Sequence, residues 1–161
     1  INGRIMVVST GTPFYEACSF IGDIQAFTAY RRGCKGIVID GYVRDKKGLD
    51  EVPIPVWGRG FRPNAGSKKE AGQVGSPINI AGTTIRLDDY LIADEDGVLV
   101  IPKEQLMTAQ VSAGRKDAKD EERKARVAAF DFTGNRDYES LMAPAVQTYF
   151  KSGKLDKERL R

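Results

Sequence analysis

An aspartate and an arginine–aspartate pair stand at a spacing that can bring them into one cleft. Asp23 is at the start of a predicted helix. Arg44 and Asp45 follow it after a gap of twenty residues and come shortly after a predicted apolar strand. At a helix start, the free backbone N–H groups of Ile24 and Gln25 and the helix dipole favour an anion. Strand ends and the starts of neighbouring helices share one sheet edge in α/β proteins. We therefore expect these groups to line a single cleft.

These residue types suit a small carboxylate together with a hard cation. The planar guanidinium of Arg44 matches a carboxylate through two parallel hydrogen bonds. Paired carboxylates and water suit Mg²⁺ or Mn²⁺, which chelates the carboxylate and keto oxygens of a 2-oxo acid. Breaking the bond beyond the α-carbon leaves a pyruvate enolate, which Arg44 and the metal stabilise. The pattern indicates aldol-type carbon–carbon cleavage, with Asp23 orienting a metal-bound water that moves protons.

The composition excludes several other kinds of site. The chain has no histidine, so Ser/His/Asp and Cys/His nucleophiles and histidine-rich zinc sites are excluded. Its charge of +3 comes from 25 basic and 22 acidic residues, a balance that does not favour a nucleic-acid or membrane partner. Cys18 and Cys34 fit no zinc spacing, which favours a reducing, cytoplasmic compartment. At 161 residues, the chain has the size of one soluble domain.

Three elements position the expected cleft. Arg4–Ser9 predicts a short strand, which the turn residues of Ser9–Pro13 end. Gly22–Gly33 predicts a helix, on the apolar positions Ile24, Phe27, Ala29 and Tyr30. Gly36–Gly41 is a nearly continuous apolar run, typical of a strand buried on both faces. The order strand, helix, strand predicts a parallel crossover.

The second half of the sequence predicts antiparallel strands followed by helices. Pro53–Trp57 is extended and Gly58–Gly75 has the composition of a surface loop. Four short strands are expected at residues 78–80, 83–85, 90–93 and 98–101, and helices at 103–130, with a possible break at Gly114, and 138–151, bent or begun at Pro144. The charged tail Lys151–Arg161 is a helical end or frayed. We expect a domain over residues 1–130 and a C-terminal helical extension over 131–161.

The sequence resembles the metal-dependent 4-hydroxy-4-methyl-2-oxoglutarate aldolases and the related RraA-like regulators of ribonuclease E activity. The likeness runs from about residue 4 to about residue 105. An aspartate, twenty residues and an Arg-Asp pair form the aldolase signature of this family, and the ordered set of segments is far more specific than the pair alone. The segments are Ile5-Met-Val-Val, Gly22-Asp23, Gly36 to Asp45, Pro55 to Gly60, Val74 to Gly82 and Asp89 to Pro102.

The resemblance implies a fold, an assembly and a set of roles. The fold is a compact swivelling β/β/α domain of the α/β class, similar to an α/β/α sandwich and with a mixed sheet. The assembly is a homo-trimer or hexamer with active sites near subunit interfaces. Oxaloacetate decarboxylation is an implied side activity. The resemblance also implies roles for residues of this chain. Arg44 binds the substrate carboxylate and enolate, Asp45 ligates the metal partly through water, and Asp23 orients a metal-bound water. Gly22, Ile24 and Gln25 bind substrate, the last two through their amides.

The sequence departs from the family pattern at both ends. The N-terminal helical segment that usually precedes the strand beginning at Arg4 is expected here to be truncated, or to lie before the first numbered residue in a longer protein. The region after Lys103 is longer and more charged than the family pattern. An acidic residue that a neighbouring subunit contributes to the site is therefore not assigned, with Glu121 and Glu122 as the candidates.

Other interpretations of the charged residues carry less weight. Arg44-Asp45 in isolation is typical of a solvated surface turn, and Asp23 of an ordinary helix start. Asp94, Glu95 and Asp96 lack the ligand spacing of a calcium loop, so a hairpin turn is favoured. The candidates for a Schiff-base aldolase are Lys35, Lys46 and Lys47, which stand in charged surroundings rather than a desolvated pocket. Arg59-Gly-Phe-Arg62, with Lys68 and Lys69, faintly resembles a nucleic-acid loop, but a solvated loop is favoured.

Two functions from different classes follow. The first is a divalent-metal-dependent aldolase that cleaves 4-hydroxy-2-oxo (di)acids to pyruvate and a carbonyl product. The alternative is a non-catalytic interaction module that regulates a ribonuclease by binding. Asp45 discriminates between them, because the regulators tend to lack an acid after the arginine.

Overall fold

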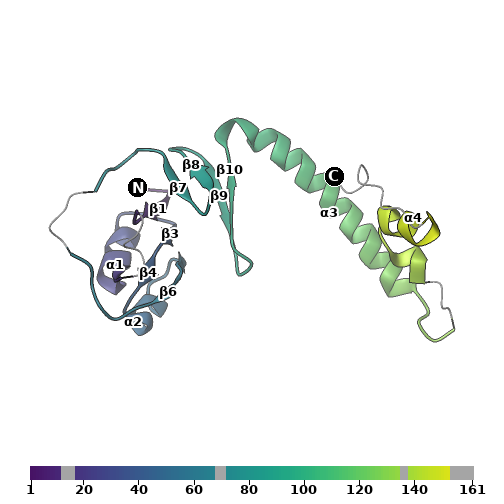
Figure 1. Cartoon of the computed structure of the whole chain (residues 1–161), viewed down its shortest axis with the longest axis horizontal. Coiled ribbons are helices and arrows are strands. Elements are labelled where there is room, and N and C mark those ends of the chain that lie inside the picture. Colours follow the sequence, from purple (N-terminus) through teal and green to yellow (C-terminus); the bar gives the residue numbers. More distant parts are fainter. Residues whose placement is uncertain (12–16, 68–71, 135–137, 153–161) are drawn as a thin grey trace. The chain divides into compact units, whose positions relative to one another are not determined.

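The computed structural model describes residues 1–11, 17–67, 72–134 and 138–152 (Figure 1). Expectations that fall on Thr12 and Pro13, on Lys68 and Lys69, and on the tail after Ser152 lie outside these residues. The chain divides into two compact units, Ile1–Leu106 and a second unit that begins at Met107. The division that we expect at residue 130 stays a prediction.

The parallel part of the first unit is built from a strand–strand–helix arrangement that occurs twice and is followed by two more strands. The first strand of each set joins one parallel sheet, in the order β1-β3-β5, and the second strand joins another, in the order β2-β4-β6. The elements are β1 (Ile5–Ser9), β2 (Ser19–Ile21), α1 (Asp23–Arg31), β3 (Gly36–Asp40), β4 (Tyr42–Val43), α2 (Lys46–Asp50), β5 (Val56–Trp57) and β6 (Gly60–Phe61). The predicted parallel pairing of the first and second apolar strands is confirmed as β1 with β3.

The apolar strand predicted over 36–41 does not lead directly to the site. It ends at Asp40, and after Gly41 the chain enters β4, which belongs to the other sheet. A Cβ at Gly41 would lie 2.8 Å from Thr10 Cγ2, and the Thr10 hydroxyl donates to the Asp40 carbonyl at 2.8 Å. The missing side chain at Gly41 lets Thr10 approach at this crossing. Arg44 and Asp45 therefore follow the short strand β4 rather than the apolar strand β3.

The helix predicted over 22–33 is α1, and Ala29 alone is buried among the four apolar positions that indicate the helix. Ala26 and Ala29 pack into the core with Ile37 and Ile39 of β3. The larger apolar side chains point outward, with exposed fractions of 75% for Ile24, 48% for Phe27 and 38% for Tyr30. Small alanines allow the helix to lie close to the strands, so the larger residues are left on the surface.

The antiparallel half follows the sequence closely. β7 (Ile78–Ile80) pairs with β8 (Thr83–Ile85), and β9 (Tyr90–Ala93) pairs with β10 (Val98–Ile101), each as an antiparallel hairpin. Parallel and antiparallel pairs thus occupy separate sheets, instead of the one mixed sheet expected. The region predicted as a loop over 58–75 contains β6. The sequence pattern missed this strand because two residues are too few to show a periodicity.

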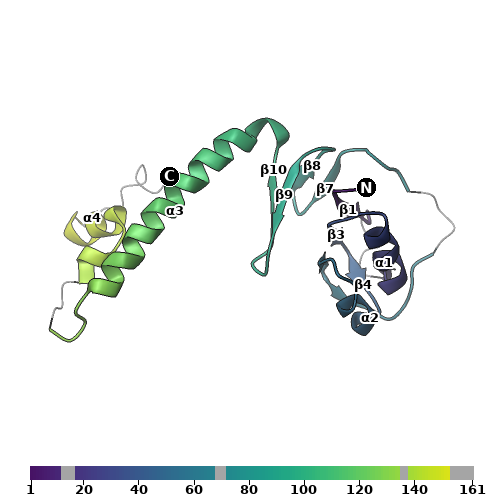
Figure 2. The same cartoon turned by 180° about the vertical axis from the view of Figure 1, so that it is seen from behind.

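The second unit is helical among the residues that the structure describes. A short 3-10 turn at Lys103–Gln105 leads into α3 (Leu106–Ala129), which continues without a break through Gly114. A second 3-10 turn, Tyr138–Leu141, precedes α4 (Pro144–Ser152), which begins at its proline and lies beside the C-terminal part of α3 (Figure 2). Within the described part of the chain, no helix has the length and apolar character needed to cross a membrane.

Candidate functional site

Three neighbouring parallel strands end at one edge of the β2-β4-β6 sheet, and a glycine follows the first strand and an arginine each of the other two. Arg44 N–H donates to the Ile21 carbonyl at 2.9 Å, and Arg62 N–H donates to the Val43 carbonyl at 2.9 Å. These bonds extend the sheet ladder one step beyond the assigned strands. Gly22, Arg44 and Arg62 therefore stand side by side in one row at this edge.

Gly22 makes room for the side chains of Arg44 and Asp45. Its backbone is extended, with φ −125° and ψ −173°. A Cβ at this position would lie 2.5 Å from Asp45 Oδ2 and 3.0 Å from Arg44 Nε. The two side chains lie against each other there, with Arg44 Nε and Asp45 Oδ2 3.4 Å apart. The predicted pair is thus folded back over the start of α1.

Gln25 fixes the other end of the arginine. Its side-chain oxygen accepts from Gly22 N–H at 3.1 Å, which caps α1, and from Arg44 Nη2 at 3.3 Å. The Arg44 side chain is 18% exposed, so its guanidinium is held largely within the protein while one side stays accessible. The sequence predicts that Gln25 binds substrate through its backbone amide. The structure adds a contact between its side chain and Arg44.

Asp23 lies against the second helix. A Cβ at Gly48, in the middle of α2, would overlap the Asp23 carboxyl group. The carboxylate accepts from Ile24 N–H, with Asp23 Oδ1 2.7 Å from the amide nitrogen. The Ile24 amide, a predicted substrate contact, is thus bonded within the helix start in this structure.

Asp45 has an unusual backbone conformation. Its φ of 60° and ψ of 49° are left-handed, a region that aspartate and asparagine tolerate better than most residues. Its carbonyl accepts from Leu49 N–H at 2.9 Å, so it starts α2. Its carboxylate remains 48% exposed. Such conformations concentrate at functional sites, where the surrounding structure maintains them.

The carboxylates of Asp23 and Asp45 suit a water-rich divalent ion. The Asp45 carboxylate lies against Gly22, which precedes α1, and the Asp23 carboxylate lies against Gly48 of α2. Among the described residues, no group of three or more His, Cys, Asp or Glu is placed to hold a metal ion. Mg²⁺ keeps several waters and takes one or two protein carboxylates together with substrate oxygens. The donor set therefore fits Mg²⁺ or Mn²⁺ bound jointly with substrate.

The alternative sites lose support in this geometry. Lys35, Lys46 and Lys47 are exposed, and Lys46 forms an ion pair with Asp50 at 2.7 Å. Asp94 Oδ1 accepts from the amides of the turn between β9 and β10, at 2.9 Å from Asp96 N and 3.3 Å from Gly97 N, which confirms the hairpin turn.

Arg59 and Arg62 flank β6, at its start and at its end, rather than lying in a free loop. Arg59 Nε lies 2.5 Å from Asp40 Oδ1, and its amide donates to the Gly41 carbonyl at 2.9 Å. Sequence reasoning missed two groups at the site, Gly48 and Arg62. Their elements are five and two residues long, too short for a periodic signal.

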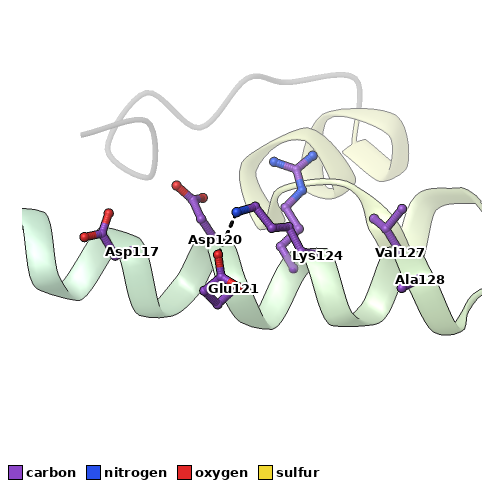
Figure 3. Close-up of a pocket in the computed structure, with 7 residues that line it drawn as sticks. Asp117, Asp120, Glu121, Lys124, Val127 and Ala128 are labelled. Atoms are coloured by element: carbon purple, nitrogen blue, oxygen red, sulfur yellow. Dashed lines mark hydrogen bonds and ion pairs between the residues drawn. The ribbon is translucent and has the colours of Figure 1, made fainter. Parts of the chain in front are cut away.

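An open pocket on α3 belongs to the second unit, and its lining includes Glu121 but none of Asp23, Arg44 and Asp45. Charged side chains border it (Figure 3), and Glu121 forms an ion pair with Lys124 at 2.6 Å. The roles considered for Glu121 and Glu122 across a subunit interface stay predictions. The pocket is lined by Asp117, Asp120, Glu121, Arg123, Lys124, Val127 and Ala128.

Known proteins resemble this chain in sequence. An uncharacterized protein of Methanocaldococcus jannaschii is 33% identical over 125 residues, which are 78% of this chain and 59% of that protein. A 4-hydroxy-4-methyl-2-oxoglutarate aldolase of Thermus thermophilus is 33% identical over 101 residues, which are 63% of this chain and 60% of that protein. The chain spans about three fifths of the length of these curated relatives.

Solved structures share the fold. RraAS2 of Streptomyces coelicolor, described as an unusual member of the RNase ES inhibitor RraA family, matches with a TM-score of 0.70 and 27% identity, covering 78% of this chain and 63% of that one. The RNA-processing inhibitor RraA of Thermus thermophilus matches with a TM-score of 0.57 and 30% identity, covering 63% of this chain and 61% of that one. Both likenesses support the mixed α/β fold with parallel sheets.

The family is settled by the extent of one match. The model of the RraA-like family, described as Aldolase/RraA, covers residues 1–100 and so includes both parallel sheets and the row of residues at their edge. The chain therefore belongs to the RraA-like family.

Proposed function

We propose that this chain carries the active site of a divalent-metal-dependent aldolase that cleaves 4-hydroxy-2-oxo acids to pyruvate and a carbonyl product. The observation that carries the proposal is a pair of close contacts at the starts of two helices: Arg44 and Asp45 lie against Gly22, and Asp23 lies against Gly48. Relatives named 4-hydroxy-4-methyl-2-oxoglutarate aldolase add support. Oxaloacetate decarboxylation follows as a side activity, because it passes through the same enolate.

Arg44 supplies the positive charge that the reaction needs. Its guanidinium is largely enclosed, and Gln25 holds it at one nitrogen. A group fixed in this way stabilises developing negative charge without reorganising during the reaction. We assign it to the substrate carboxylate and to the enolate oxygen that forms when the carbon–carbon bond breaks.

Asp23 and the start of α1 complete the substrate contacts. Asp23 is the proposed base, which takes a proton from the substrate hydroxyl through a water and returns one to the enolate carbon. Gly22 and the amides of Ile24 and Gln25 would contact the substrate carboxylate. For Ile24, this requires the Asp23 carboxylate to release the amide that it accepts from in this structure.

A divalent ion, Mg²⁺ or Mn²⁺, would be held by Asp45, with Asp23 close by through water. When bound, the ion supplies Lewis-acid polarisation of the 2-oxo group. The protein's part is to hold Asp45 in its left-handed conformation, so that the carboxylate is half exposed beside Arg44.

A homo-trimer or hexamer is the proposed assembly. Ile24, Phe27 and Tyr30 form an exposed apolar stripe on α1, which begins at the site. Contiguous apolar surface of this kind marks interaction sites in proteins.

Cys18 and Cys34 are free thiols, which agrees with the proposed cytoplasmic location.

The alternative function is regulation of a ribonuclease by binding. It is favoured by the likeness to RraAS2, described as an unusual member of a ribonuclease-inhibitor family, and to the Thermus thermophilus protein, described as an RNA-processing inhibitor. Asp45 argues for the enzyme, because a binding module does not need a carboxylate beside Arg44.

The test is pyruvate release from oxaloacetate and from a 4-hydroxy-2-oxo acid, with Mg²⁺ or Mn²⁺ and again with a chelator. We expect turnover that the chelator abolishes and that Arg44→Ala reduces at least 100-fold, about the effect of removing one enolate-stabilising group. Turnover that persists with the chelator, or in Arg44→Ala, would contradict the mechanism. No turnover in an intact oligomer that binds a ribonuclease would favour the alternative.

A further inference from the structure

Arg62 occupies the position next to Arg44 in the row at the sheet edge. The pairs Tyr42 with Gly60 and Val43 with Phe61 fix the register of β4 and β6, and the Arg62 amide bond to Val43 continues it. Backbones of neighbouring strands lie about 4.8 Å apart. In-register residues of parallel strands also share one face of the sheet. Arg62 thus lies on the same face and at the same edge as the proposed catalytic arginine.

The Arg62 side chain is held in place by an aromatic ring, and its Nε is left without a partner in the described part of the chain. Its guanidinium carbon lies 4.5 Å from the centre of the Tyr42 ring, and Gly60, beside that ring, leaves space for it. Its Nε is shielded from solvent and has no hydrogen-bond partner among the residues that the structure describes. By contrast, Arg44 lies beside Asp45 and Arg59 beside Asp40.

A shielded guanidinium donor without an acceptor is uncommon in folded proteins. Buried polar groups are generally paired, and an unpaired one costs free energy. Arginine presents a planar fork whose natural partner is a carboxylate or phosphate. The Arg62 side chain is therefore oriented for an acceptor from outside the described residues.

We propose that Arg62 determines specificity by binding the distal carboxylate of a dicarboxylic 2-oxo acid. This inference rests on the proposed function, which assigns Arg44 to the carboxylate and 2-oxo end of the same substrate. Two guanidinium groups on adjacent strands match the two ends of a short diacid. A monocarboxylic substrate would engage Arg44 and leave Arg62 without an acceptor.

The kinetic test compares two substrates that differ only in the distal carboxylate, 4-hydroxy-2-oxoglutarate and 4-hydroxy-2-oxobutanoate. In Arg62→Met, we expect kcat/KM for the diacid to fall about 10- to 100-fold, the range for a hydrogen bond between charged groups. The loss should lie mainly in KM, and the value for the monoacid should stay within about twofold because that substrate does not use the contact. Arg62→Lys should recover part of the diacid preference.

A binding test keeps the inference separate from the proposed chemistry. Calorimetry with 2-oxoglutarate and 2-oxopentanoate, each with Mg²⁺, measures the diacid preference without turnover. We expect the wild-type chain to bind 2-oxoglutarate more tightly and Arg62→Met to lose that preference. A wild-type chain that binds with this preference but cleaves neither hydroxy acid would overturn the proposed chemistry and leave the role of Arg62 supported.

Two controls identify a structural effect. Arg31→Met removes an exposed arginine from the last turn of α1, about 12 Å along the helix from Asp23, and should leave the diacid preference intact. Thermal unfolding of Arg62→Met and Arg62→Lys shows whether either variant is misfolded. Equal losses for diacid and monoacid in a folded Arg62→Met, or an unchanged preference, would overturn the inference.

Discussion

Gly48 of α2 lies against the Asp23 carboxylate so closely that a single methyl group at residue 48 would displace it. A second glycine, Gly22, stands in the same relation to Asp45. The proposed acidic groups therefore each lie over a residue without a side chain. These two contacts join α1 to α2. Glycine is needed at both positions because a side chain would clash with the carboxylates, and not because the backbone conformation demands it.

Gly48→Ala separates helix stability from the position of Asp23. Alanine favours a helix interior over glycine by about 1 kcal/mol, and Gly48 has no positive φ that would oppose it. The new methyl would move the Asp23 carboxylate, and a shift of about 1 Å costs on the order of 100-fold in rate. We expect kcat to fall by about this factor in steady-state assays of pyruvate release.

The control for this variant is Gly114→Ala in α3, where a Cβ would meet nothing within 4 Å. Urea unfolding should show the helix gain at residue 114 and no such gain at residue 48. Unchanged kcat in a folded Gly48→Ala would show that Asp23 does not act from this position.

Gly22→Ala should disable the site while preserving the fold. The extended backbone of Gly22 suits any residue, so the only conflict is steric, with Asp45 Oδ2 and Arg44 Nε. Overpacking of this kind costs about 1–3 kcal/mol. We expect loss of Mn²⁺ affinity and of pyruvate release, measured by calorimetry and by the coupled assay. Gly72→Ala, in open space, should change neither quantity.

Substitutions of Asp45 distinguish its carboxylate from its backbone. Asparagine tolerates the left-handed conformation, whereas alanine there costs about 1–2 kcal/mol. We expect Asp45→Asn to unfold at nearly the wild-type urea concentration and Asp45→Ala at a lower one. Both should lose Mn²⁺ binding and metal-dependent turnover. Wild-type turnover in Asp45→Asn would remove Asp45 from the metal site.

Elements with a clear sequence pattern could be predicted, and the shortest ones could not. The four antiparallel strands match residue for residue, because their β-branched runs are bounded by turn residues. β4, β6 and α2 have two, two and five residues, and they exist because neighbouring strands and helices hold them. Their ends carry Arg44 and Asp45, so the sequence pattern could not predict the elements that position these two residues.

The outward face of α1 shows a second limit. The apolar spacing of Ile24, Phe27 and Tyr30 predicts a helix with an apolar face, but it does not predict whether that face packs against the core or stays exposed. In this chain, Ala26 and Ala29 fill the core contact, since the close approach of helix and strand leaves no room for larger side chains. Arg62 could not be predicted as a site residue for a related reason, because its place next to Arg44 depends on the register of β4 and β6.

The ion pair between Arg4 and Asp88 should affect stability at acid pH. The hydrogen bond and then the charge of Arg4 hold the pKa of the Asp88 carboxyl below its ordinary value of 3.8. A depressed pKa contributes stability that is present above the unfolded-state pKa and is lost as pH falls through the folded-state pKa. Wild-type urea midpoints should therefore fall more steeply than those of Asp88→Asn between pH about 5 and about 3. Parallel midpoints for the two proteins over that range would contradict a stabilising pair.

The exposed stripe on α1 predicts that Phe27→Glu weakens self-association. Phe27 is 48% exposed and its ring lies 6.1 Å from that of Tyr30, so a charge there would have to lose its water in any interface formed by this stripe. We expect the dissociation constant of the oligomer to rise at least tenfold, which corresponds to about 1.4 kcal/mol, in sedimentation or light-scattering measurements. Leu87→Glu, at another exposed apolar residue of the first unit, is the matched control and should leave the assembly intact. An oligomer that survives Phe27→Glu but dissociates in Leu87→Glu would place the interface away from α1, and the site would then have to be complete without a neighbouring subunit at this helix.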